Sequence, residues 1–215
     1  MNQQIGPLPH PRRMMIFFDG ENLAARYQAM VKDGWAARPD MFHTRDSLLY
    51  GDGMAHLALV GFHEVLRATY YTSTTGDDAA LIALSQQIKA LSVSRHRLAS
   101  LPCNLTPQVF KRDKGTSRSK GVDIKLAVDV LTQVHNDTVD SVYILSGDGD
   151  YLPLMDEVLR HGKHLYVSAF SSGLSPKARQ VADQFYLLDH HVFPHGAPIA
   201  AHGLAGTQPT TPGLP

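Results

Sequence analysis

A short apolar run, Met14-Met15-Ile16-Phe17-Phe18, is followed directly by Asp19 and Gly20. A continuous run of this length, without polar residues, is typical of a strand that a parallel sheet buries on both faces. Residues 21–31 then have the pattern of a helix. The stretch therefore predicts a buried strand over residues 14–18, an acid where that strand ends, and a helix directly after it.

The same alternation continues through the chain. Apolar and aromatic runs predict further strands at residues 67–73, 106–112, 142–145, 165–170 and 185–188. Helical patterns lie at residues 77–93, 121–135, 151–160 and 176–182. Alternating strands and helices indicate an α/β protein, with a parallel sheet that helices cover on both faces.

Composition separates the central part, residues 14–190, from the two ends of the chain. Residues 1–13 contain three prolines and no periodicity, and we interpret them as a disordered arm. Residues 195–215 contain no Asp, Glu, Lys or Arg and are rich in Gly, Pro, Thr and Ala, which predicts a disordered tail. Within the domain, residues 33–63 include Pro39 and several glycines, and we expect a helical insertion there.

The overall composition excludes some functions and leaves others open. Lys+Arg and Asp+Glu number 20 each, so any basic surface for nucleic acid must be local. Cys103 is the only cysteine, which excludes an internal disulfide and a zinc site of several cysteines. We find no signal-peptide pattern and no apolar stretch of membrane-spanning length, so we expect a cytoplasmic protein. The twelve histidines are scattered, and we interpret them as solvated or hydrogen-bonded.

Acids follow two of the predicted strands. Asp19 ends the first strand, and Asp148 and Asp150 lie in the turn Ser146-Gly147-Asp148-Gly149-Asp150 that follows residues 142–145. In an open parallel sheet, ligand sites form beyond the carboxyl ends of the strands. Asp123 opens the buried stripe of the helix at 121–135, since it shares a helix face with Leu126 and Val130. Each acid alone has a structural explanation, as a helix cap or a turn residue.

Together, these acids indicate a metal site. Carboxylates held close together repel one another strongly, and a hard divalent cation such as Mg²⁺ or Mn²⁺ neutralises that repulsion. Such an ion can make a hydroxide from bound water and stabilise charge on a phosphate. Asp129 differs, because it lies on another side of the helix, where we expect it to pair with Lys125. The chain has no P-loop pattern and no Gly-x-Ser-x-Gly elbow.

Three motifs, in order along the strand–helix units, resemble those of the NYN domain family, a branch of the PIN-like nuclease superfamily. They are Phe17-Phe18-Asp19-Gly20-Glu21-Asn22-Leu23, Lys120-Gly121-Val122-Asp123-Ile124-Lys125-Leu126-Ala127-Val128-Asp129 and Leu145-Ser146-Gly147-Asp148-Gly149-Asp150-Tyr151-Leu152-Pro153-Leu154. Gly162-Lys163 and Ala182-Asp183-Gln184-Phe185 resemble the family's C-terminal pattern. The resemblance covers roughly residues 14–189.

The resemblance implies a PIN-like fold, which is a Rossmann-like, three-layer α/β/α sandwich around a central, mainly parallel sheet. It implies a metal-dependent ribonuclease that hydrolyses single-stranded RNA. The implied ligands of Mg²⁺ or Mn²⁺ are Asp19, Asp123, Asp148 and Asp150. It also implies that Asn22 supports the metal site and that Ser146 lies near the scissile phosphate. No membrane partner is expected, and assembly into a homo-oligomer stays open.

A basic cluster leads into Asp123 and predicts an RNA-binding surface. Its members lie within ten residues that contain one acid, Asp113, and they are Lys111, Arg112, Lys114, Arg118 and Lys120. A basic loop beside an acidic metal site would hold a phosphate backbone while the metal acts on it. The alternative is a loop whose charges only keep it solvated.

Two other functions stay open at this point. One is a regulatory RNA-binding protein with weak or no nuclease activity. The other is a phosphatase of the haloacid dehalogenase type, which also places acids at strand ends. Such a phosphatase needs a second Asp two residues after its nucleophilic Asp, and this chain has Glu21 at that position.

Overall fold

The structure is a computed structural model that describes residues 10–51, 54, 63–94, 102–113, 115 and 120–197, without the side chains of Ser94 and Lys120. Most of the predicted arm and tail, at residues 1–13 and 195–215, lies outside the described residues. The first strand begins at Arg12, so Arg12 and Arg13 belong to the folded domain rather than to an arm.

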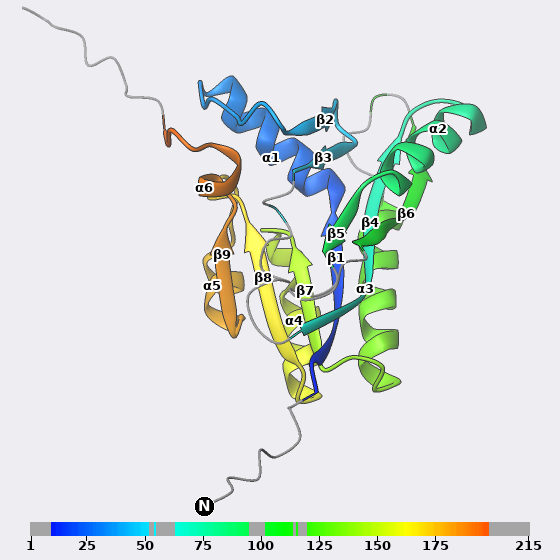
Figure 1. The fold of residues 1–215 in the computed structure, drawn as a ribbon, viewed down its shortest axis with the longest axis vertical. Coiled ribbons are helices and arrows are strands. Elements are labelled where there is room, and N and C mark those ends of the chain that lie inside the picture. Colours follow the sequence, from blue (N-terminus) through cyan, green and yellow to red (C-terminus); the bar gives the residue numbers. More distant parts are fainter. Residues whose placement is uncertain are drawn as a thin grey trace, which may run out of the picture.

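Seven strands of the described chain form one sheet, in the spatial order β5-β6-β4-β1-β7-β8-β9 (Figure 1). The parallel strands are β1 (Arg12–Asp19), β4 (His63–Thr74), β6 (Pro102–Lys111), β7 (Ser141–Leu145), β8 (His164–Ala169) and β9 (Gln184–Leu187). At one edge, β5 (Ser92–Ser94) pairs antiparallel with β6. In chain order, β4 and β6 are added to the sheet on one side of β1, and β7 is then added on the other side. The carboxyl ends of β1 and β7 therefore form a switch point, where open α/β sheets place their ligands.

Helices cover both faces of the sheet and complete a three-layer sandwich (Figure 1). In the described chain they are α1 (Gly20–Lys32), α2 (Asp78–Lys89), α3 (Lys120–His135), α4 (Leu152–Arg160), α5 (Pro176–Val181) and α6 (Asp189–Val192), and the 3₁₀ turn η2 (Gly149–Tyr151) precedes α4. Alternate side chains of β1 enter different cores, because Ile16 and Phe18 pack with α1 and α2 whereas Phe17 packs with α3 and α4. This double burial explains the continuous apolar run and confirms the predicted mainly parallel α/β fold. No helix in the described part of the chain is long and apolar enough to cross a membrane.

The predicted helical insertion at residues 33–63 lies partly outside the described residues, at 52–53 and 55–62. Its described part contains no helix and instead forms a short antiparallel pair, β2 (Phe42–Thr44) and β3 (Leu48–Tyr50). Asp46 turns the chain between them with φ of 58°, a left-handed conformation that Asp tolerates better than most residues. The buried hydroxyl of Tyr70 then holds the backbone of Leu49 extended, since it accepts from the Leu49 N–H at 2.9 Å and donates to the Leu49 carbonyl at 3.1 Å. Tertiary contacts with β4 thus decide this segment.

Candidate active site

Asp19 lies at the switch point between β1 and β7. It is the last residue of β1, its side chain is buried, and its Oδ1 accepts the backbone N–H of Asn22 at 3.1 Å, which caps α1. Its Oδ2 accepts the hydroxyl of Ser146, the residue that follows β7, at 2.8 Å. The two neighbouring strands are therefore joined at their carboxyl ends through one buried carboxylate.

The turn after β7 carries the second acid. Ser146 Oγ accepts the backbone N–H of Asp148 at 3.2 Å, and Asp148 in turn caps η2 by accepting the N–H of Asp150 at 3.1 Å. The N–H of Gly147 donates to Asn22 Oδ1 at 3.4 Å. These bonds hold Asp148 on the same side of the turn as Asp19, and they leave the buried Nδ2 of Asn22 without an acceptor.

Gly20 allows α1 to begin directly against β4. A Cβ at this position would overlap the ring of Tyr70 and lie 2.8 Å from the carbonyl oxygen of Tyr71. Both neighbours are buried and part of the central sheet, so neither can move away cheaply. The close approach places Asn22 one half-turn into the helix, beside the turn that follows β7.

Tyr151 brings the third acid into the group. Its side chain is 4% exposed, and its hydroxyl donates to Asp123 Oδ1, on the first turn of α3, at 3.0 Å. Burial raises the pKa of Tyr151 far above its usual range, and the negative charges of Asp19, Asp123 and Asp148 raise it further. The hydroxyl therefore keeps its proton and remains a donor. Asp19, Asp123 and Asp148, which we call the acid group, thus lie around one buried phenol.

The role of Asp150 as a fourth metal ligand stays a prediction. Its side chain is exposed, and its contribution to the turn is the backbone N–H that it donates to Asp148. The carboxylate oxygens of Asp19, Asp123 and Asp148 do not all lie within 4.8 Å of one another. Among the described residues, three ligand atoms all within 4.8 Å of one another occur only at His135, Glu157 and His161. A metal between the acids would have to bridge a wider space than that.

The predicted basic cluster divides in the structure. Lys111 is exposed at the end of β6, whereas Lys114, Arg118 and the side chain of Lys120 lie outside the described residues. Arg112 is buried, with its Nη1 4.0 Å from Glu21 Oε1, and Ser73 donates its hydroxyl to the same carboxylate. Whether these cations bind RNA stays a prediction.

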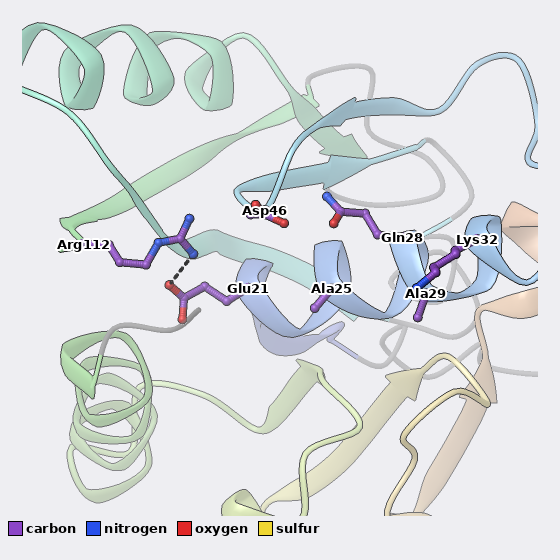
Figure 2. A pocket seen from close by; sticks show the side chains of 7 residues that line it. All are labelled: Glu21, Ala25, Gln28, Ala29, Lys32, Asp46 and Arg112. Atoms are coloured by element: carbon purple, nitrogen blue, oxygen red, sulfur yellow. Dashed lines mark ion pairs between the residues drawn. The ribbon is translucent and has the colours of Figure 1, made fainter. Parts of the chain in front are cut away.

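Arg112 and Glu21 form the inner wall of a pocket of about 360 Å³ along α1 (Figure 2). The pocket is lined by Glu21, Ala25, Gln28, Ala29, Lys32, Asp46 and Arg112. Figure 2 shows Glu21 reaching from the start of α1 towards Arg112, with Asp46 facing the middle of the same helix. The carboxylate of Glu21 is thus engaged by Ser73 and Arg112, although its chain neighbour Asn22 lies beside the acid group.

Sequence patterns do not reveal two features of this region. For Tyr151 they indicate only the start of a helix. Its position one residue after Asp150 is the one sequence feature that points to a contact with the acids. For Arg112 they indicate an open loop, because nothing local reveals that Glu21, far away in the chain, is its partner. Asp129 is confirmed as the ion-pair partner of Lys125, at 2.6 Å, and it also accepts the hydroxyl of Tyr71 at 2.9 Å.

Comparison with known families shows the family of the chain. The family model described as NYN domain matches residues 13–189. The chain belongs to the NYN domain family. NYN domains are PIN-like and as a class are nucleases, which typically use divalent metals and act on RNA. A search of curated proteins found no match.

A solved structure shows the same fold at low sequence identity. This NYN domain is similar to the crystal structure of a protein of unknown function from Vibrio parahaemolyticus, with a TM-score of 0.57 and 18% identity. The match covers 89% of this chain and 99% of that one. A structure of a candidate oxidoreductase from Parabacteroides merdae is 9% identical, with a TM-score of 0.33 over 84% of this chain and 33% of that one. That second likeness is too weak to carry an argument.

Proposed function

We propose that this NYN domain is a metal-dependent ribonuclease that hydrolyses single-stranded RNA at the acid group, Asp19, Asp123 and Asp148. The observation that carries the proposal is the gathering of these three carboxylates around the hydroxyl of Tyr151, at the switch point of the sheet. Membership of a nuclease family adds the reaction class.

The residues of the acid group fit a hard divalent cation. Their donors are carboxylate oxygens, which suit Mg²⁺ or Mn²⁺ rather than a soft metal. Mg²⁺ usually keeps several water ligands and is bound through one or two carboxylates together with substrate phosphates, so acids spaced beyond direct contact remain suitable. When bound by Asp19, Asp123 and Asp148, the ion would supply an acidified water and positive charge beside the phosphate.

The chain's own residues position this chemistry. Ser146 donates to Asp19 and accepts from the Asp148 backbone, so its hydroxyl orients the two acids. Asn22 keeps a buried amide N–H₂ without an acceptor, and we assign it to an oxygen of the scissile phosphate. An unsatisfied buried donor is unfavourable until an acceptor reaches it, which favours binding of the anion.

The pocket along α1 supports a single-stranded substrate. Its volume of about 360 Å³ is within the range of sites that hold one small ligand, and it is too small for a duplex. An unstacked nucleotide next to the scissile bond would enter it, with Arg112 near its phosphate at one end of the pocket and Gln28 facing its base, while Lys32 lies at the other end (Figure 2). Exposed Lys111 would extend the contact to the next phosphate.

A cleavage assay on labelled single-stranded RNA tests the proposal. With increasing Mg²⁺ or Mn²⁺ we expect products with 5′-phosphate and 3′-hydroxyl ends, because water attacks and the 2′-hydroxyl is not needed. Asp123→Asn should abolish cleavage, whereas the matched change Asp129→Asn, on the same helix but outside the acid group, should retain it. Metal-independent cleavage to 2′,3′-cyclic phosphate would overturn the mechanism. RNA binding without cleavage at any metal concentration would favour the regulatory RNA-binding function.

A further inference from the structure

Two imidazoles and a carboxylate come together where α3 and α4 end. His135 is the last residue of α3, Glu157 lies in the last turns of α4, and His161 directly follows that helix. One ligand atom of each residue lies within 4.8 Å of the other two. Within the described part of the chain this is the tightest set of potential metal ligands, and the sequence patterns give it no role.

The cluster is separate from the proposed active site. Asp123 lies on the first turn of α3 and His135 on the last, which puts the two about 18 Å apart along the helix axis. Likewise α4 starts directly after Tyr151 and ends beside His161. Figure 1 shows both helices running along the same face of the sheet, from its carboxyl edge towards the opposite edge. One pair of helices therefore joins the two sites.

The geometry suits a small tetrahedral ion. Glu157 Oε1 lies 3.3 Å from His161 Nδ1 and 3.9 Å from His135 Nε2. Ligands of a tetrahedral ion with bonds of about 2.0–2.2 Å are about 3.3–3.6 Å apart, so the Glu157–His161 separation fits and the Glu157–His135 separation is close, while the two imidazole nitrogens lie within 4.8 Å of each other. Arg160 Nη1 binds the other oxygen, Glu157 Oε2, at 2.7 Å and leaves Oε1 for the ion.

His161 must adjust to bind. Its Nδ1 also lies 2.9 Å from the backbone carbonyl oxygen of Glu157, so in the metal-free protein this nitrogen carries the proton and donates it. To bind the ion, one ring nitrogen of His161 must be without a proton, and its lone pair must point at an ion held beside Glu157 Oε1. The side chains of His161 and His135 are 35% and 51% exposed, so both rings have room to rotate.

We propose that His135, Glu157 and His161 bind a divalent transition-metal ion that prefers imidazole ligands, of the zinc type. Two imidazoles and one carboxylate differ from the all-oxygen ligands that Mg²⁺ prefers, so the two sites select different ions. The bound ion ties the end of α3 to the end of α4. Because α3 carries Asp123 and η2–α4 carries Tyr151, this link holds in register the two elements that join at the acid group.

Zinc titration of the full chain in excess Mg²⁺ tests the site. We expect one Zn²⁺ per chain and a rise in melting temperature with Zn²⁺, since the folded state alone holds the ligands together. Loss of even an outer-shell partner weakens a metal site by roughly 10–100-fold, so the double variant His135→Gln/His161→Gln should bind Zn²⁺ at least about 100-fold more weakly. The control His10→Gln/His190→Gln removes two other exposed imidazoles and should bind like the wild type.

Two further measurements separate the site from its alternatives. Co²⁺ should give a d–d absorption band in the wild type that disappears in Glu157→Gln, a change that keeps the shape of the side chain. Asp123→Asn should leave Zn²⁺ affinity unchanged, so failure of the nuclease proposal would not affect this result. Equal Zn²⁺ affinity in the wild type and the His135/His161 variant, an equal loss in the His10/His190 control, or no Zn²⁺ binding by the wild type would each overturn the proposal.

Discussion

Replacement of Tyr151 by Phe tests whether its hydroxyl orients Asp123 for metal. The change removes one donor, at 3.0 Å from Asp123 Oδ1, and keeps the buried ring in place. A hydrogen bond to a charged group contributes about 1.5–3 kcal/mol, but Asp123 is only part-buried and water replaces some of this. We therefore expect the free energy of unfolding without metal to fall by about 1–1.5 kcal/mol, or about 2–5 °C in melting temperature.

The larger effect should be on metal dependence. Loss of an outer-shell partner lowers metal affinity by about 10–100-fold, so the Mg²⁺ concentration for half-maximal cleavage should rise by a similar factor. Affinity for RNA should stay unchanged in chelator, because the hydroxyl of Tyr151 is bound to Asp123 and we assign it no contact with RNA. The assay is cleavage of labelled RNA over a Mg²⁺ series, with RNA binding measured in parallel.

Tyr71→Phe is a matched control for this change. Tyr71 is equally buried, and its hydroxyl donates at 2.9 Å to Asp129, on the same helix but outside the acid group. It should lose a similar amount of stability and keep the wild-type Mg²⁺ midpoint. If Tyr151→Phe leaves that midpoint unchanged, or if Tyr71→Phe shifts it as much, Tyr151 has no special role in positioning Asp123.

Three further predictions follow from other parts of the structure. Gly20→Ala should destabilise the protein by about 1–3 kcal/mol in urea unfolding, because its Cβ would overlap Tyr70 and lie 2.8 Å from the Tyr71 carbonyl; wild-type stability would contradict that packing. Arg13 binds Asp140 through Nη2 at 2.7 Å and lowers the pKa of that carboxyl below 3.8, so the stabilisation is complete above pH 3.8 and is lost as pH falls through the lowered value. Asp140→Asn should therefore destabilise the protein at pH 7, and by progressively less as the pH falls below 3.8; a loss that does not change with pH would refute the ion pair. Replacing Lys111 and Lys114 by Ala should reduce the slope of log K for RNA against log salt by about 0.7 for each phosphate that the variant no longer binds, while Lys89→Ala should not change it.

The sequence predicts those parts of the structure that depend on local pattern. Residues 14–18 are apolar without interruption because helices cover β1 on both faces. The continuous run in the sequence therefore predicts this buried strand. The acids at strand ends can be found because topology alone places Asp19 beside the turn at Asp148. The pair β2–β3 is not predictable, since the hydroxyl of Tyr70, which follows in the chain, holds Leu49 extended.

Pairing between distant residues limits the rest. The helix predicted over residues 77–93 ends at Lys89, because residues 92–94 form the edge strand β5, which pairs with β6. Arg112 looks like a loop cation until α1 brings Glu21 to it. The histidines look scattered because His135 meets Glu157 only through the packing of α3 on α4. Each of these contacts depends on the completed sandwich rather than on any window of sequence.

The hydrogen bond between Ser146 and Asp19 spans 127 positions of the chain, and this separation bears on when the protein first becomes able to act. During translation, Asp19 is synthesised long before Ser146, so the hydrogen bond between them cannot form until β7 has been made. No nascent fragment that ends before residue 146 can assemble the acids. With the function proposed above, chains that end before Asp148 should not cleave RNA, because they lack one carboxylate of the acid group.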